Sequence, residues 1–387
     1  MGMWVGRGRK ARICYGFEEI ALVPGKITVD PDEVDTGFEI GGYKFTVPII
    51  AAAMDGVMNV EMAISLSKFG SFGVLNLEGI QTRYENPEGI CDQIASASPS
   101  EATAILQRIY EEPIKEELIA KRIREIKEGG GIACVSSIPQ KAERFGKLAK
   151  EAGADIFVVQ ATVTTVRYIS GGNPSLDFAK LKKELEIPLI VGNCVTYEVA
   201  LELMAEGIDG LLVGVGPGAA CTTRGVLGVG VPQVTATADC AAARDTYFKK
   251  RAKYVPIITD GGMSVGGEIC KAIASGADAV MIGSAFTKAK EAPGKGFHWG
   301  MATPHRNLPR GTRIKTGVTG SLEQILYGPA HLDDGSQNLV GALRTAMGVC
   351  GARNIKEMQE TELIIAPSVQ TEGKIFQRAQ GIGMGKI

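Results

Sequence analysis

The feature that most constrains this chain is a short, β-branched apolar run that recurs eight times, each time followed by a segment with helical spacing. The runs lie at 47–54, 72–77, 131–137, 155–160, 188–193, 210–216, 255–262 and 279–286. They are almost continuously apolar, which is typical of strands buried on both faces of a parallel sheet. Eight strand–helix units predict a closed (β/α)8 TIM barrel, with 1–387 as a single domain. A doubly wound open sheet is the alternative, but the Gly-x-Gly-x-x-Gly turn that it needs after the first strand is absent.

The composition is that of a folded globular protein. Apolar residues make up 45% of the chain and charged residues 22%, with a net charge of −1, which argues against disorder and against binding to nucleic acid or anionic membranes. No secretory or membrane-spanning segment is evident, and the eight cysteines contain no Cys-x-x-Cys pair. We therefore expect a protein of the reducing cytoplasm.

Two segments interrupt the strand–helix rhythm. Residues 81–130 are polar and lack strand signals, so we expect extra helices there and no inserted domain. Residues 292–322 contain no Asp or Glu, and follow the last predicted strand, whose loop opens on the catalytic face of a barrel. We expect a catalytic flap whose cations favour a polyanionic ligand, such as a dinucleotide with a 2′-phosphate. Those cations are Lys295, Arg306, Arg310, Arg313 and Lys315.

A phosphate cradle is predicted where the seventh and eighth strands end. The seventh ends in Asp260-Gly261-Gly262 and the eighth in Gly283-Ser284. Barrels commonly bind phosphate in these two loops, through backbone N–H groups. Asp260 could then accept hydrogen bonds from ribose hydroxyls. The alternative is that the glycines only close tight turns.

The loop after the sixth strand, residues 214–224, carries a cysteine among glycines. Backbone N–H groups and Arg224 would favour the thiolate of Cys221, which suits covalent addition to an electron-poor carbon. Thr223 could relay a proton. An inert, buried cysteine is the alternative. Three loop carbonyls could also bind a monovalent cation, those of Gly216, Gly218 and Cys221.

The first predicted strand ends in three alanines followed by Met54. Small residues there allow a flat ring to approach closely, and the thioether of Met54 offers a soft surface to a purine. A core methionine is the alternative interpretation.

Together these motifs resemble the IMP dehydrogenase/GMP reductase family, in a divergent branch without CBS domains. The resemblance covers 15–79 and 152 to about 354, and its most specific parts are 214–224, 228–233, 260–262, 274–284 and 291–294. It implies a barrel that assembles as a homotetramer and binds a purine mononucleotide, GMP or IMP.

The resemblance also implies roles for particular residues. Cys221 would attack C2 of the purine to give a covalent thioimidate, assisted by Thr223, while Asp260 would hold the ribose. Gly262, Gly283 and Ser284 would bind the phosphate, and Met54, Gly300 and Met301 would lie near the base. Asn193, Arg224 and Arg306 would contact the nicotinamide cofactor, and a potassium ion could lie on the cysteine loop.

The direction of the reaction is predicted from what the chain lacks. Dehydrogenases of the family carry a CBS insertion after the second strand and an Arg-Tyr pair in the flap, and neither is found at 80–130 or 292–322. A basic flap without tyrosine favours an NADPH-dependent GMP reductase that forms IMP and ammonia. An NAD-dependent IMP dehydrogenase that forms XMP is the alternative.

Three positions depart from the family pattern. The flap glutamate of reductases is missing from 307–311, the aspartate that ends the fourth strand is Gln160, and the phosphate-contacting serine of the cysteine loop is Ala219. These departures leave two further classes open. A flavin-dependent oxidoreductase would be yellow and would not need Cys221, and a nucleotide-binding regulator would bind without turnover.

Overall fold

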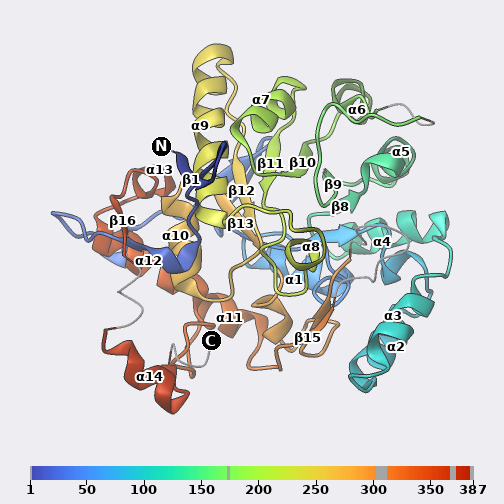
Figure 1. Ribbon diagram of the computed structural model, residues 1–387. Helices are drawn as coiled ribbons and strands as arrows, with labels where there is room; N and C mark the ends of the chain where they lie inside the picture. Colours follow the sequence, from blue (N-terminus) through green and yellow to red (C-terminus); the bar gives the residue numbers. More distant parts are fainter. Residues whose placement is uncertain (1, 172–174, 302–311, 367–371, 384–387) are drawn as a thin grey trace.

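Eight parallel strands form a ring at the centre of the protein (Figure 1), in the order β6-β13-β12-β11-β10-β9-β8-β7. The computed structural model describes residues 2–171, 175–301, 312–366 and 372–383. A parallel bridge between Ala51 and Gly73 joins the first and last members, so the ring closes. The strands are β6 (Ile49–Ala51), β7 (Val74–Asn76), β8 (Cys134–Ser137), β9 (Ile156–Gln160), β10 (Leu189–Cys194), β11 (Gly210–Val213), β12 (Ile257–Asp260) and β13 (Ala279–Ile282).

The predicted TIM barrel is therefore confirmed, with each strand inside or within one residue of its predicted run. Its apolar runs are continuous because both faces of the ring are covered. Ile190 and Leu212 lie in the inner cluster of the barrel, whereas their neighbours Val191 and Leu211 pack outward against the helices. An alternating strand would leave one of these faces polar.

Helices follow the strands around the outside of the ring. Several begin at side-chain caps; the Asn59 side chain, for example, accepts the backbone N–H of Met62 at 2.8 Å. The helices that cover the barrel are α1 (Val60–Lys68), α4 (Glu116–Glu128), α5 (Ala142–Glu151), α6 (Phe178–Leu185), α7 (Tyr197–Ala205), α9 (Gln233–Arg251), α10 (Gly266–Ala274), α11 (Leu322–Tyr327) and α12 (Leu339–Cys350). None of the described helices is both long enough and apolar enough to cross a membrane.

An aromatic plug closes the end of the barrel where the strands begin. The hairpin of β4 (Phe38–Ile40) and β5 (Tyr43–Phe45) packs there, with the Phe45 ring 4.6 Å from that of Phe72. The interior therefore opens only at the end where the strands finish.

The two interrupting segments have defined structure. Two helices, α2 (Pro87–Ser96) and α3 (Ala102–Ile109), precede α4 within 81–130. The ends of the expected flap are not irregular, because β14 (Phe297–Trp299) pairs antiparallel with β15 (Arg313–Lys315). The remaining elements are β1 (Gly2–Gly6), β2 (Arg9–Arg12), β3 (Ile20–Leu22), β16 (Leu363–Ile365), α8 (Thr223–Leu227), α13 (Ile355–Met358), α14 (Lys374–Gln380) and five short 3-10 helices, η1 (Phe17–Glu19), η2 (Pro31–Glu33), η3 (Ile80–Thr82), η4 (Pro139–Lys141) and η5 (Phe286–Lys288).

A buried carboxylate ties several elements together at the plugged end. Asp278, just before β13, accepts the backbone N–H of Ile257 at 2.8 Å, and pairs with the buried Arg244 of α9 at 3.0 Å. It also accepts the Tyr254 hydroxyl at 2.7 Å. Lys356 of α13 reaches the same carboxylate. The group therefore joins α9, β12, β13 and α13.

We expect Asp278→Ala to lower the free energy of unfolding by about 3–5 kcal/mol, because the buried Arg244 guanidinium loses its buried partner and keeps the exposed Asp245 as its counter-charge. Asp239→Ala is the matched control, since Asp239 pairs with Arg12 at the surface, and such pairs contribute at most ~1 kcal/mol. Urea unfolding of both variants measures the difference. Equal losses would show that the Asp278 network adds nothing beyond a surface pair.

Candidate active site

The open end of the barrel holds a cavity of about 590 Å³. Every barrel strand contributes to its wall at or just beyond the strand's carboxyl end, so residues far apart in the chain meet there. The volume lies within the ~300–1,000 Å³ range of small-molecule sites. The contributions are Ala52 after β6, Asn76 on β7, Ser136 on β8, Gln160 on β9, Asn193 on β10, Gly214 after β11, Asp260 on β12 and Gly283 after β13.

Cys221 is exposed on the cavity wall, at the start of the turn that leads into α8. Its Sγ lies 3.2 Å from the Oγ1 of Thr223, whose side chain is buried. Its backbone N–H donates to the carbonyl of Gly218 at 3.0 Å, which tightens the loop. The alternative of a buried cysteine is therefore excluded. The loop places a nucleophile and a hydroxyl together at the cavity.

Two side chains hold the cysteine loop in place. Arg224 donates to the carbonyls of Val215 at 3.2 Å and Val231 at 2.7 Å. Gln233 donates to the carbonyls of Val213 and Asp260 at 2.9 and 2.8 Å, linking the ends of β11 and β12. Arg224 thus acts within the loop, and it does not line the cavity.

Three polar side chains form one hydrogen-bonded group on the cavity wall. Asp260 Oδ2 accepts from Asn193 Nδ2 at 2.8 Å and from Gln160 Nε2 at 3.0 Å. Gln160 Nε2 also donates to Asn193 Oδ1 at 3.2 Å. Burial raises the pKa of Asp260 to about 6, although the two amide donors act in the opposite direction. None of the described residues donates to Oδ1, which can accept from ligand hydroxyls.

The predicted phosphate cradle lies beside this group. Gly261 and Gly262 have φ values of +83° and +81°, a conformation that favours glycine. A Cβ on Gly262 would also stand 3.0 Å from Pro217 in the cysteine loop, so the two loops approach closely. Backbone groups, rather than a basic side chain, face the space between them.

Ser284 completes the cradle, and a buried histidine orients it. The Oγ of Ser284 lies 3.2 Å from Nε2 of His298, the middle residue of β14. Burial lowers the pKa of His298 to about 4, so the ring is neutral, and its buried Nδ1 has no partner among the described residues. We assign the proton to Nε2, because a buried N–H without a partner costs more than a buried lone pair. The Ser284 hydroxyl hydrogen is then available to a ligand.

The structure brings together nearly all residues that the sequence singled out. Arg224 lies behind the cysteine loop, and Arg306 falls outside the described residues. The residues that line the cavity are Met54, Asn193, Gly216, Gly218, Cys221, Thr223, Asp260, Gly262, Gly283, Ser284, Gly300 and Met301.

Sequence reasoning missed several wall residues. Ser136, Ser137 and Asn76 lie at the ends of predicted strands, which is a signal that could have identified them. Arg83, from the extra helical segment, carried no such signal. Other missed wall residues include Glu78, Gln140, Gln160, Thr162 and His298, of which Gln160 had been noted only as a departure from the family.

Comparison with known proteins agrees with this architecture. The family model for the IMP dehydrogenase/GMP reductase domain matches residues 14–374. An uncharacterized oxidoreductase of Mycobacterium leprae is 35% identical over 371 residues, covering 94% of this chain and 99% of that protein. An inosine-5′-monophosphate dehydrogenase of Methanocaldococcus jannaschii is 28% identical over 480 aligned residues, covering 94% and 95%.

A solved structure has the same fold over almost the whole chain. The crystal structure of an IMP dehydrogenase/GMP reductase-like protein from Corynebacterium glutamicum superposes with a TM-score of 0.89 at 34% identity, covering 94% of this chain and 97% of that one. On this fold and these matches, the chain belongs to the IMP dehydrogenase/GMP reductase family of oxidoreductases, in a form without CBS domains.

Proposed function

We propose that the protein oxidises or reduces C2 of a purine 5′-mononucleotide through a covalent bond to Cys221. The observation that carries this proposal is the exposed Cys221 Sγ, 3.2 Å from a buried threonine hydroxyl, in the same cavity as Asp260 and the glycine cradle. In the oxidative direction the thiolate would add to C2 of IMP, C2 would give up hydride to NAD, and water would then replace the thiolate as the C2 oxygen of XMP. In the reductive direction the thiolate would displace ammonia from C2 of GMP, and hydride from NADPH would then release the thiolate as IMP forms. Thr223 is placed to carry a proton to or from the reacting group.

The remaining cavity residues suit such a nucleotide. Asp260 Oδ1 accepts the ribose hydroxyls, and the backbone at Gly262 and Gly283 together with the Ser284 hydroxyl receives the phosphate. Met54 and Met301 offer polarisable surfaces to the base. The roles of these residues are part of the proposal.

We place the nicotinamide dinucleotide on the side of the first cavity where β8 and β9 end. A second cavity of about 320 Å³ shares Gln140, Ala161 and Val163 with the first. The nicotinamide ring supplies or accepts the hydride when bound, with Asn193 and Gln160 as its polar neighbours. None of the described residues that line the second cavity is Lys or Arg, and Glu143 is acidic. Lys180 pairs with Glu143 at 3.7 Å and offsets its charge, so the choice between NAD and NADPH follows from the direction of the reaction.

We take IMP dehydrogenase as the first candidate for the direction of the reaction. A reductase must protonate ammonia as it leaves C2 of GMP, and the carboxyl groups among the described wall residues are Asp260 and Glu78. Asp260 is assigned to the ribose, while Glu78 accepts the Ile138 N–H and pairs with Lys141 at 2.8 Å. Thr223, beside Cys221, would therefore have to supply that proton, whereas in a dehydrogenase the same hydroxyl would take a proton from the attacking water. The relative from M. jannaschii is likewise named as a dehydrogenase.

GMP reductase with NADPH is the second candidate. It is favoured by the cation-rich segment 292–322, which has neither the acidic residues that would repel a 2′-phosphate nor a tyrosine to assist hydrolysis. Three further properties also stay predictions. They are assembly as a homotetramer, a cytoplasmic location, and a potassium ion on the carbonyls of Gly216, Gly218 and Cys221.

Absorbance at 340 nm tests the proposal, with IMP and NAD in one assay and GMP and NADPH in the other. We expect turnover with IMP and NAD, and a loss of at least 10³-fold in kcat for Cys221→Ala, because the nucleophile is removed. Cys14→Ala, a partly exposed cysteine outside the cavity wall, is the matched control. Turnover only with GMP and NADPH would reverse the direction. Full activity in Cys221→Ala, or nucleotide binding without any turnover, would refute the covalent mechanism.

We further expect nucleotide affinity to fall as the pH falls through about 6. Burial raises the pKa of Asp260 to about 6, so the carboxylate that accepts the ribose hydroxyls is present above this pH and lost below it. One unit below that pKa, at pH 5, the ionised fraction and with it the affinity should drop about tenfold.

The nucleotide phosphate titrates in the same range, so the comparison needs a control. Asp260→Asn removes the carboxyl group and retains the phosphate, and binding calorimetry from pH 5 to 8 should show a shallower pH profile for this variant. Identical slopes in both proteins would assign the whole pH effect to the phosphate.

A further inference from the structure

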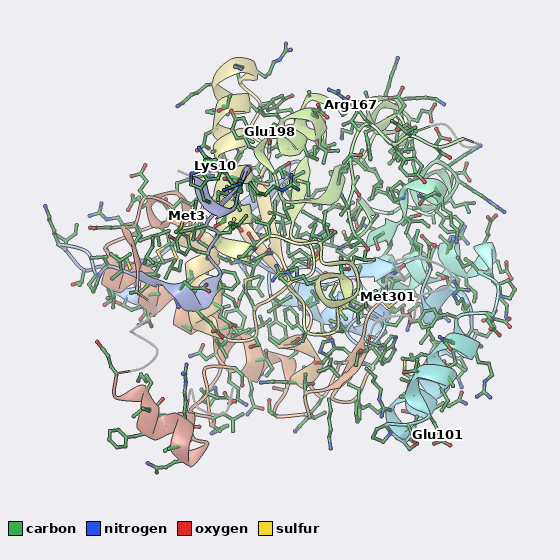
Figure 2. All side chains as sticks on the ribbon, viewed as in Figure 1. Met3, Lys10, Glu101, Arg167, Glu198 and Met301 are labelled. Atoms are coloured by element: carbon green, nitrogen blue, oxygen red, sulfur yellow. The ribbon has the colours of Figure 1, made fainter. Side chains whose placement is uncertain are left out.

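The helical insertion packs against the base of the predicted flap. Figure 1 shows α2 and α3 at the edge of the molecule, beyond the ring of helices. Figure 2 shows Glu101, just before α3, at the outer edge and Met301 near the middle. A separate apolar cluster joins the two regions, and Trp299 of β14, fully buried, lies within it. The insertion contributes Cys91, Ile94, Leu106, Ile109 and Tyr110.

The hydroxyl of Tyr110, just after α3, is the polar centre of this contact. It donates to Asp55 Oδ2 at 2.5 Å and accepts the indole N–H of Trp299 at 2.8 Å. The sulfur of Met301 lies 3.4 Å from the same oxygen. Tyr110 and Asp55 are both buried, so these hydrogen bonds are shielded from water.

These bonds connect two sides of the active-site cavity. Asp55 follows Met54 in the chain, and its Oδ2 also accepts the N–H of Ile80 in η3. Trp299 directly precedes Gly300 and Met301. Met54 on one side and Gly300 and Met301 on the other line the part of the cavity that we assign to the base. The Tyr110 hydroxyl therefore controls the separation of the two surfaces.

A second tie reaches the other strand of the same hairpin. Arg313 of β15 donates to the carbonyls of Ile94 and Ala97 at the carboxyl end of α2. A cation is favourable at that end of a helix. Lys295, before β14, pairs with Asp92 of α2. The insertion thus holds both strands of the hairpin.

We propose that the α2–α3 insertion is a positioning element for the purine base, and that Tyr110 is its positioning residue. This inference rests on the proposed function, because it takes the space between Met54 and Met301 as the base site. Tyr110 touches neither the reacting atoms nor the phosphate cradle.

Tyr110→Phe tests the proposal, with Tyr84→Phe as the matched control. Each substitution removes one phenol hydroxyl from the same insertion. The Tyr84 hydroxyl, however, donates to the Ile109 carbonyl at 2.8 Å and so makes its hydrogen bond inside the insertion. Calorimetry measures the affinity of each protein for IMP, for GMP and for ribose 5-phosphate, which lacks the base. All titrations are run well below the unfolding temperature of each variant.

We expect Tyr110→Phe to bind IMP and GMP about tenfold more weakly while its affinity for ribose 5-phosphate changes less than twofold. Tyr84→Phe should match the parent with all three probes. Arg313→Gln, which removes the second tie, should weaken nucleotide binding in the same selective way if Tyr110→Phe does not fold.

Equal losses for nucleotide and ribose 5-phosphate, or equal losses in both tyrosine variants, would overturn the proposal and leave the insertion a general stabilising element. Unchanged nucleotide affinity in Tyr110→Phe would overturn it as well. A parent protein that binds neither IMP nor GMP would remove the proposed function and this inference with it, and that outcome is visible before any variant is made.

Discussion

The parallel hydrogen bonding that closes the eight-stranded ring is the constraint on which the rest of the structure depends. Because all strands run in one direction, their carboxyl ends meet at one end of the barrel, and the aromatic plug around Phe45 and Phe72 blocks the other. Cys221, Asp260 and Ser284 come from three different strand–helix units, yet they face one cavity. No local interaction in the sequence would bring them together. The backbone pairing of the ring brings them to one place.

The cavity wall carries amide side chains and backbone groups at positions where charged side chains would be expected. Gln160 in place of an aspartate gives Asp260 a hydrogen-bond donor, whereas a second carboxylate 3.0 Å away would repel it. The phosphate cradle that we propose consists of glycine backbone and of Ser284, whose hydroxyl lies 3.2 Å from Nε2 of the neutral His298. Such a site keeps a single ionisable carboxyl next to the expected ribose, and its ionisation is controlled by burial and by two amides.

Features of the protein that depend on local sequence patterns could be predicted, and features that depend on contacts between distant segments could not. Strand positions, the cysteine loop and the cradle were predictable because each depends on local patterning: continuous apolar runs, glycines at turns, a nucleophile among them. Arg224 was expected at the cofactor, but its guanidinium is occupied by the Val215 and Val231 carbonyls. Residues 292–322 were expected to form a catalytic flap, and the pairing of Phe297–Trp299 with Arg313–Lys315 inside that segment was not predicted. Both differences arise from contacts between segments that no local pattern encodes.

The barrel, its family and most of the residues that face the cavity could be predicted from the amino-acid sequence, because hydrophobic periodicity and strand-end position are properties of neighbouring residues. The pairing of polar groups could not, and it became visible in the folded chain: Gln160 with Asp260, His298 with Ser284, and Tyr110 with Asp55 and Trp299. Buried polar groups need partners at distances near 3 Å, and those partners are supplied by the packing of elements more than ten residues apart in the chain.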